Sequence, residues 1–208
     1  DKMSHLSIDV FIYEPNSQIK EKLKEERVQL TDARAMLLFM LYKLVANGEF
    51  VSEFSSEKIC YFLQRFGAKE HFKLDYKPNF YGPYSGKVKY VINYLNGSYI
   101  MGYSSMDKKP FETLDLVSDG FEKVEGYILS KPELVEIVNR TELFLDGFYS
   151  EFALELLSTV DYISLNKDTF DLEIIKSELE GWSERKRTLF SNDRFLNISI
   201  NHLKEHFG

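Results

Sequence analysis

Tyrosine is the residue whose spacing in this chain most favours a chemical role. Seven of the thirteen tyrosines lie between residues 72 and 103, around a Tyr-Gly-Pro-Tyr turn at Tyr81–Tyr84. Tyrosine rings on a rigid turn offer binding area at low cost in conformational entropy, and they are common at interfaces. The same rings could instead extend a hydrophobic core, with their hydroxyl groups at its edge. For this turn we favour core packing, because so many exposed rings would form a large apolar patch.

Motifs for catalysis, cofactors or metals are scarce. The chain has no glycine-rich phosphate loop, no Gly-x-Ser-x-Gly and no His-Glu-x-x-His motif. His202 and His206 share a face of a predicted helix, but a third metal ligand is lacking. Cys60 lies near an apolar helical stripe, which favours a small buried side chain over a nucleophile. We therefore predict no catalytic residue, no cofactor-binding residue, no metal ligand and no enzymatic activity.

The acidic side chains are concentrated in one part of the chain. The net charge is −7, and residues 108–180 alone carry 17 acidic and 7 basic side chains. A domain that binds duplex DNA needs the opposite charge, and the run Arg185–Arg187 is too short to form a nucleic-acid arm. Direct binding of nucleic acid is therefore not expected. The acidic side chains could also form no more than a solvated helical surface, and Glu151 and Glu155 are expected on the polar face of their helix.

The elements that position these residues are mostly helical. Thr31 is a suitable N-cap for a helix through Val45 that is apolar almost all round, which is typical of a central helix. A further helix is expected at 57–66, after a cap at Ser55 or Ser56. Another is expected to begin with Pro83 in its first turn and to carry its apolar stripe at 88–95. Later helices are expected at about 121–128, 152–165, 172–180 and 196–207. Two more are expected to begin at caps, one at a capping box with Ser130 as N-cap and one at Ser183. Short strands are expected at 6–13, 99–103 and 114–117.

This pattern predicts a mostly helical α+β fold with two small lobes. We divide the chain into a strand and linker at 1–30, a tyrosine-rich helical lobe at 31–117 and an acidic helical lobe at 118–208. The boundary between the lobes could instead lie near Asp146 and Gly147. The three short helices after Gly147 are similar in outline to a helix-turn-helix or winged-helix lobe. A single cysteine and the lack of a long apolar run or an apolar signal core favour the cytoplasm and no membrane association.

Six segments resemble, in order and spacing, the C-terminal region of DarG antitoxins. They are Lys58–Gln64, Tyr81–Tyr84, Leu95–Tyr103, Gly147–Tyr149, Leu154–Val160 and Trp182–Lys186. The combination of segments is more specific than any one of them, and it spans about residues 57–190. One departure is Ser98, where the family pattern usually has histidine.

The resemblance implies an antitoxin module of a toxin–antitoxin system, without the macrodomain that the full-length family carries. In that family the toxin DarT attaches ADP-ribose to DNA, and the C-terminal region of DarG binds and neutralises it. The expected partner is thus a DarT-like toxin, whose DNA groove the acidic and aromatic side chains would fill. Residues 1–30 would be similar to the end of the macrodomain. The expected partner-binding residues are Tyr81, Tyr84, Tyr99, Tyr103, Glu122, Glu125, Glu151 and Glu155. The alternative function is a winged-helix DNA-binding transcriptional regulator.

Overall fold

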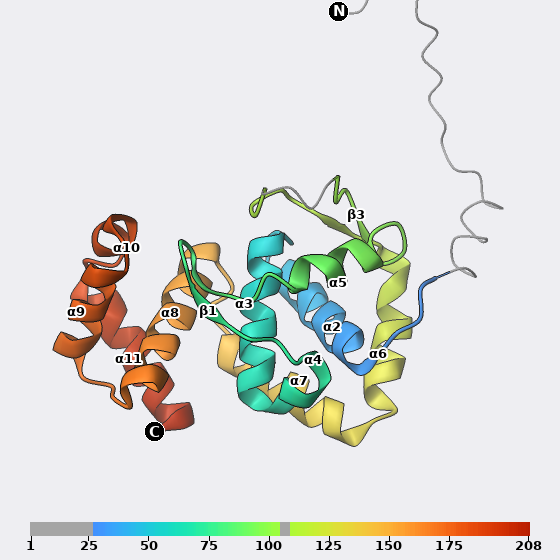
Figure 1. Ribbon diagram of the computed structural model, residues 1–208. Coiled ribbons are helices and arrows are strands. Elements are labelled where there is room, and N and C mark those ends of the chain that lie inside the picture. The colour runs from blue at the N-terminus through green and yellow to red at the C-terminus, as the bar shows by residue number, and fades with distance from the viewer. Residues whose placement is uncertain (1–26, 105–108) are drawn as a thin grey trace, which may run out of the picture.

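The structure is a computed structural model that describes residues 27–104 and 109–208 (Figure 1). The expected strand at 6–13 lies outside the described residues. The α-helices are α2 (Asp32–Ala46), α3 (Glu53–Leu63), α4 (Lys69–Phe72), α5 (Val88–Leu95), α6 (Phe121–Leu129), α7 (Pro132–Leu145), α8 (Glu151–Lys167), α9 (Leu172–Trp182), α10 (Glu184–Leu189) and α11 (Asp193–Phe207). A π-helical segment, Gln64–Ala68, follows α3, and a 3-10 turn, Ser118–Gly120, precedes α6.

In the described residues, two small antiparallel sheets accompany the helices. Strands β1 (Lys77–Asn79) and β2 (Gly82–Tyr84) form a hairpin, and β3 (Ile100–Met101) pairs with β4 (Asp115–Leu116). The mostly helical α+β prediction is confirmed. Within the described residues no helix has both the length and the apolar character needed to cross a membrane.

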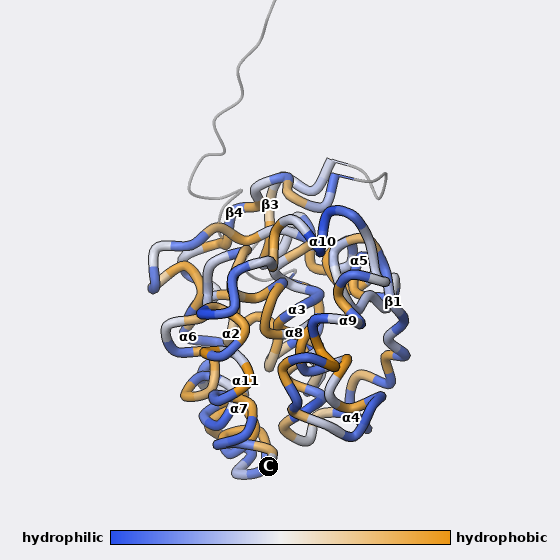
Figure 2. Tube along the Cα trace, turned by 90° about the vertical axis from the view of Figure 1, so that its left-hand side faces the viewer, coloured by the Kyte–Doolittle hydropathy of each residue, from blue (hydrophilic) through white to orange (hydrophobic). Residues whose placement is uncertain are grey.

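Helices α2 and α3 form the centre of the fold. Every residue of α2 from Ala35 to Leu41 is buried, because α3, α6 and α7 pack around it. Helix α3 is buried along its whole length, between α2 on one side and α8 on the other. Figure 2 shows hydrophobic segments where α3 and α8 cross the middle of the molecule. The position predicted for the helix that begins after Thr31 is confirmed.

Several helix boundaries agree with the predicted caps. The Thr31 hydroxyl accepts a hydrogen bond from the Arg34 N–H, and the Ser183 hydroxyl accepts one from the Lys186 N–H. The capping box predicted at Ser130 is wrong, because its hydroxyl donates instead to the Tyr127 carbonyl and Lys131 precedes the helix.

Two local predictions near the hairpin are also wrong. Helix α3 begins four residues earlier than expected, since Ser52 and Ser55 form the capping box. Pro83 does not open a helix. It lies in β2 opposite Pro78, and Gly82 supplies the positive φ of 93° that the tight hairpin requires.

The C-terminal part contains helices without a wing. In the described chain no strand follows Leu116, so the expected lobe has no wing, and the helix-turn-helix outline of the helices after Gly147 stays a prediction. Helix α8 packs against α3 and β2, while α11 and α9 pack on α8. The division of the chain into lobes near residue 117 stays a prediction.

Candidate active site

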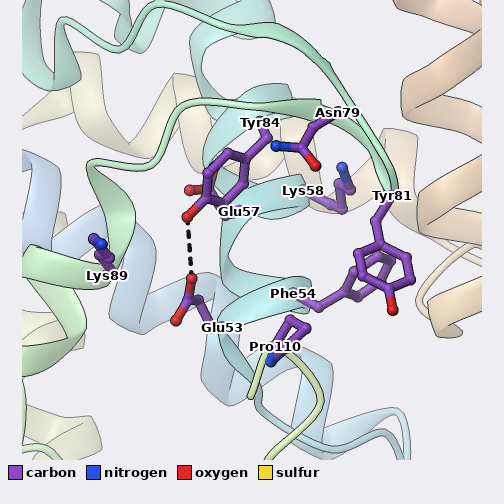
Figure 3. A pocket seen from close by; sticks show the side chains of 9 residues that line it. All are labelled: Glu53, Phe54, Glu57, Lys58, Asn79, Tyr81, Tyr84, Lys89 and Pro110. Carbon is purple, nitrogen blue, oxygen red and sulfur yellow. Dashed lines mark hydrogen bonds between the residues drawn. The ribbon is translucent and has the colours of Figure 1, made fainter. Parts of the chain in front are cut away.

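A cavity of about 500 Å³ lies where the β1–β2 hairpin arches over α3 (Figure 3). Its lining combines rings, carboxyl groups and ammonium groups from α3, the hairpin, α5 and one loop: Glu53, Phe54, Glu57, Lys58, Asn79, Tyr81, Tyr84, Lys89 and Pro110. The earlier start of α3 has a direct consequence here. It places Glu53 and Glu57 one helical turn apart on the face that the hairpin covers.

Aromatic rings form one wall of the cavity. The Tyr81 ring meets the Phe54 ring edge to face at 6.2 Å between centroids, and it meets Phe111 in the same way at 4.9 Å. Phe54 and Phe111 are themselves 4.9 Å apart. These contacts hold Tyr81 in one orientation, so the wall is a rigid apolar surface against which a flat ligand could pack.

The carboxylate of Glu53 is held by two tyrosine hydroxyl groups. Tyr103 donates to one carboxylate oxygen at 2.8 Å, and Tyr84 donates to the other at 3.4 Å. Burial, followed by the charge of Glu53, raises the pKa of the Tyr84 hydroxyl to about 12, and burial, followed by the hydrogen bond to Glu53, raises the pKa of the Tyr103 hydroxyl as well. Both hydroxyl groups therefore keep their protons at neutral pH and remain donors to the carboxylate. Figure 3 shows the Tyr84 ring above Glu53.

The carboxyl group of Glu57 is buried beneath the end of the hairpin. Its two oxygens accept hydrogen bonds from the backbone N–H groups of Gly86 at 3.1 Å and Ser85 at 3.3 Å. Burial nevertheless raises the pKa of Glu57 to about 7, against the effect of these N–H groups and of neighbouring Lys58. A carboxyl group with this pKa can take up or release a proton at neutral pH, which is the property of a general acid or base.

A buried charged cluster lies on the other side of the hairpin. The Lys186 ammonium donates to the Glu155 carboxylate at 2.6 Å and to the Thr159 hydroxyl at 3.1 Å, and Arg185 forms a second ion pair with Glu155. Lys58 donates to the Pro83 carbonyl of β2 at 2.7 Å. We call Lys58, Glu155, Thr159 and Lys186 the hairpin anchor, because they join β2 to α3, α8 and α10.

The two lysines of the hairpin anchor are held in an unfavourable environment for charge. Burial lowers the pKa of Lys58 to about 7, and the nearby Lys186 ammonium lowers it further. Burial likewise lowers the pKa of Lys186 to about 8, although Glu155 counteracts this effect. The hairpin that forms the roof of the cavity thus rests on buried ionisable side chains, and removing one of them would leave its partner uncompensated.

The expected partner-binding tyrosines divide into two groups. Tyr81 and Tyr84 are half-buried and line the cavity, whereas Tyr99 and Tyr103 are buried in the core. The core packing favoured for the Tyr81–Tyr84 turn therefore describes Tyr99 and Tyr103 better than the turn itself.

The expected acidic residues do not form one surface with the cavity. Glu122 and Glu125 lie on α6, and neither lines the cavity, while Glu151 is exposed at the start of α8. Glu155 was expected on the solvated face of its helix. That expectation is wrong, because Glu155 is 2% exposed and paired with Lys186 and Arg185.

Cys60 and His202, the other residues considered for chemistry in the sequence, are packed among neighbouring side chains of the fold. Cys60 is fully buried in α3, and burial raises the pKa of its thiol well above the usual value. His202 stacks on Phe148 at 4.4 Å, and its Nε2 lies 2.7 Å from the Phe144 carbonyl. Among the described residues no group of three or more His, Cys, Asp or Glu side chains could hold a metal ion.

The sequence predictions missed Glu53, Glu57, Lys58 and Lys186. The spacing of Glu53 and Glu57, four residues apart, was the available signal, and it would have placed both on one face of a helix beginning at Ser52. Nothing in the local sequence indicates that Lys58 and Lys186 are buried, because their partners lie more than twenty residues away.

The chain is similar to proteins that are named for an enzymatic activity on DNA-linked ADP-ribose. A protein of Thermus aquaticus named DNA ADP-ribosyl glycohydrolase is 28% identical over 184 residues, which are 87% of this chain and 50% of that protein. Proteins of the same name from Mycobacterium bovis and Mycobacterium tuberculosis are each 20% identical over 201 residues, 90% of this chain and 56% of theirs. No protein-family model matches the chain. The chain spans about half the length of the curated relatives it matches.

These names correct several expectations from the sequence. The relatives are named as glycohydrolases, which are enzymes. Their names overturn the resemblance to a DarG antitoxin region and the expected neutralisation of a toxin. They also overturn the alternative of a transcriptional regulator and the expected absence of enzymatic activity. A DarT-like toxin as partner and the exclusion of nucleic acid are overturned for the same reason.

The expectation that nucleic acid does not bind rested on the acidic charge of residues 108–180 and took no account of residues 58–89. Residues 108–180 are acidic, but residues 58–89, which include the hairpin and part of the cavity lining, carry seven basic and two acidic side chains. Affinity for a phosphate backbone depends on local charge rather than on the total.

Proposed function

We propose that this chain acts in the removal of ADP-ribose from DNA, and that the cavity under the hairpin receives the modified nucleotide. The observation that carries the proposal is the buried carboxyl group of Glu57. This group lines a cavity walled by aromatic rings and has a pKa of about 7. The name shared by the three relatives supports the same reaction.

The ring wall suits the flat part of such a substrate. A nucleobase packs well on aromatic side chains, and Tyr81 is fixed by Phe54 and Phe111 before any ligand arrives. Little conformational entropy is then lost on binding. Lys89, which lines the cavity, and the exposed Lys73 and Lys77 add attraction for the phosphate groups of DNA and of ADP-ribose.

Glu57 is the residue that we assign to proton transfer. In its ionised form it takes a proton from a water molecule, whose oxygen then bonds to the anomeric carbon of the ADP-ribose. The bond from that carbon to the DNA base breaks, its electron pair stays with the base, and the released base takes up the proton that Glu57 accepted from the water. Free ADP-ribose and unmodified DNA are the products.

The second carboxylate has a different task in this scheme. Glycoside hydrolysis passes through a transition state with positive charge on the sugar ring, and a nearby carboxylate stabilises that charge. Glu53 is suited to this because two tyrosine hydroxyl groups fix its position. DNA as the substrate also agrees with the cytoplasm that the single cysteine predicts.

A single-stranded oligonucleotide carrying one ADP-ribosylated base tests the proposal. The chain is incubated with it, and both binding and release of free ADP-ribose are measured for the unaltered protein, for Glu57→Gln and for Glu122→Gln, a control on α6. Release that only Glu57→Gln reduces would support the whole proposal.

Two other results are informative. Binding without release would keep the modified nucleotide in the cavity and assign the chemistry to the part of the relatives that this chain does not span. Neither binding nor release would contradict the proposal.

A further inference from the structure

Phe80 lies at the tip of the β1–β2 hairpin between two hollows. Its ring is 53% exposed. One hollow, of about 610 Å³, lies between the tip and the end of α9 and includes Trp182. The other, of about 580 Å³, lies between the tip and α10 and includes Arg185 and Leu189. An exposed ring alone is ordinary, but a ring bordered by two hollows is accessible to a ligand from both sides.

The first hollow shares a lining residue with the cavity under the hairpin, and the two hollows share Phe80 and Ser183. Asn79 lines both the cavity and the first hollow, and Phe80 lines both hollows. The Phe80 and Tyr81 rings meet edge to face at 4.8 Å, so the ring wall of the cavity extends onto the outer surface. A ligand too long for the cavity would leave it along this path.

The hairpin tip is held rigidly by its neighbours. The Trp182 indole N–H donates to the Asn79 carbonyl at 2.9 Å. The Arg185 guanidinium carbon lies 4.9 Å from the Tyr81 ring centre and 5.6 Å from that of Phe80. A fixed aromatic ring beside a guanidinium plane is a surface on which nucleobases stack.

We propose that Phe80 is a stacking platform for the base next to the modified nucleotide, with Arg185 at its side. This rests on the proposed function. A base has an apolar face and polar edges, and the first hollow offers the matching surface, a ring bordered by the polar side chains of Ser177 and Ser183. The cavity would thus hold the modified nucleotide, and the tip would bind the strand that leaves it.

The substitution Phe80→Ala removes the platform with little effect on folding, because the ring is half exposed. Affinity is measured for two ligands: a single ADP-ribosylated nucleotide, and a short single-stranded oligonucleotide with the same modified base in its middle. We expect Phe80→Ala to weaken oligonucleotide binding by about 5- to 100-fold and to leave binding of the single nucleotide unchanged. Phe80→Trp keeps a stacking ring and should keep the affinity. Leu143→Ala removes another exposed apolar side chain, on α7, as a matched control.

The two ligands separate failure of this inference from failure of the proposed function. Equal oligonucleotide affinity of Phe80→Ala and the unaltered chain, with the single nucleotide still bound, would overturn the platform alone. A single modified nucleotide that does not bind the unaltered chain would contradict the proposed cavity instead.

Discussion

Gly82→Ala should destabilise the protein more than its backbone conformation alone explains. Gly82 has a φ of 93°, and a left-handed conformation costs an alanine roughly 1 to 2 kcal/mol. An added Cβ would also lie 2.6 Å from the Thr159 hydroxyl and 3.3 Å from the Lys58 ammonium. Both belong to the hairpin anchor, which cannot move freely, and overpacking of this kind costs about 1 to 3 kcal/mol more. The expected loss of unfolding free energy is therefore about 2 to 5 kcal/mol.

Gly97→Ala is the matched control for this prediction. Gly97 has a φ of 82° and nothing within 4 Å of its added Cβ, so it carries the conformational cost without the contact. Urea unfolding of both variants, followed by circular dichroism, gives the two free energies under the same conditions. The difference should favour Gly97→Ala by about 1 to 3 kcal/mol. Equal destabilisation of the two variants would refute the close approach of the hairpin to its anchor.

Two further predictions concern buried ionisable groups. Glu155→Gln should lower the unfolding free energy by about 3 to 5 kcal/mol because it leaves Lys186 without its carboxylate, whereas Glu151→Gln should change it by less than about 0.5 kcal/mol; equal urea midpoints for the two variants would contradict the ion pair. Burial lowers the folded-state pKa of His202 below 6.5, so the unfolded chain binds protons more readily, and stability present above pH 6.5 should fall as the pH drops from there through the folded pKa. His202→Gln should flatten that part of a plot of melting temperature against pH, and an unchanged slope would contradict the assignment.

The helical framework could be predicted because its signals are local. Thr31 and Ser183 cap helices as expected, since a hydroxyl group and the N–H groups it accepts from are three residues apart. The apolar stripes of α5, α8 and α11 likewise depend on neighbours within one or two helical turns. Such features are largely independent of the rest of the fold.

The candidate site could not be predicted because its causes are distant in sequence. Glu57 owes its raised pKa to burial beneath the end of the hairpin, about thirty residues away, and Glu155 is paired with Lys186, which reaches it from another helix. Sequence periodicity placed Glu155 on a solvated face, because a charged side chain is rarely buried unless it is paired. Periodicity does not reveal a partner on another helix.

The start of α3 was the local error with the largest effect. The run Ser52–Ser56 offers several possible caps, and the choice of Ser55 or Ser56 left Glu53 outside the helix. Only the true cap at Ser52 aligns Glu53 with Glu57. A short polar run therefore concealed the pair of carboxyl groups on which the proposed function depends.

The pH dependence of ADP-ribose release tests the central claim most directly. Initial rates are measured on the singly modified oligonucleotide from pH 5.5 to pH 9 for the unaltered chain and for Glu57→Gln, with melting temperatures to confirm that both are folded. If Glu57 is the base, the rate for the unaltered chain should rise as the pH passes about 7 and then level off. Glu57→Gln should be slower by about 100- to 10,000-fold and should lack that rise. A folded Glu57→Gln variant with the rate and pH profile of the unaltered chain would contradict the assignment of the reaction to this cavity.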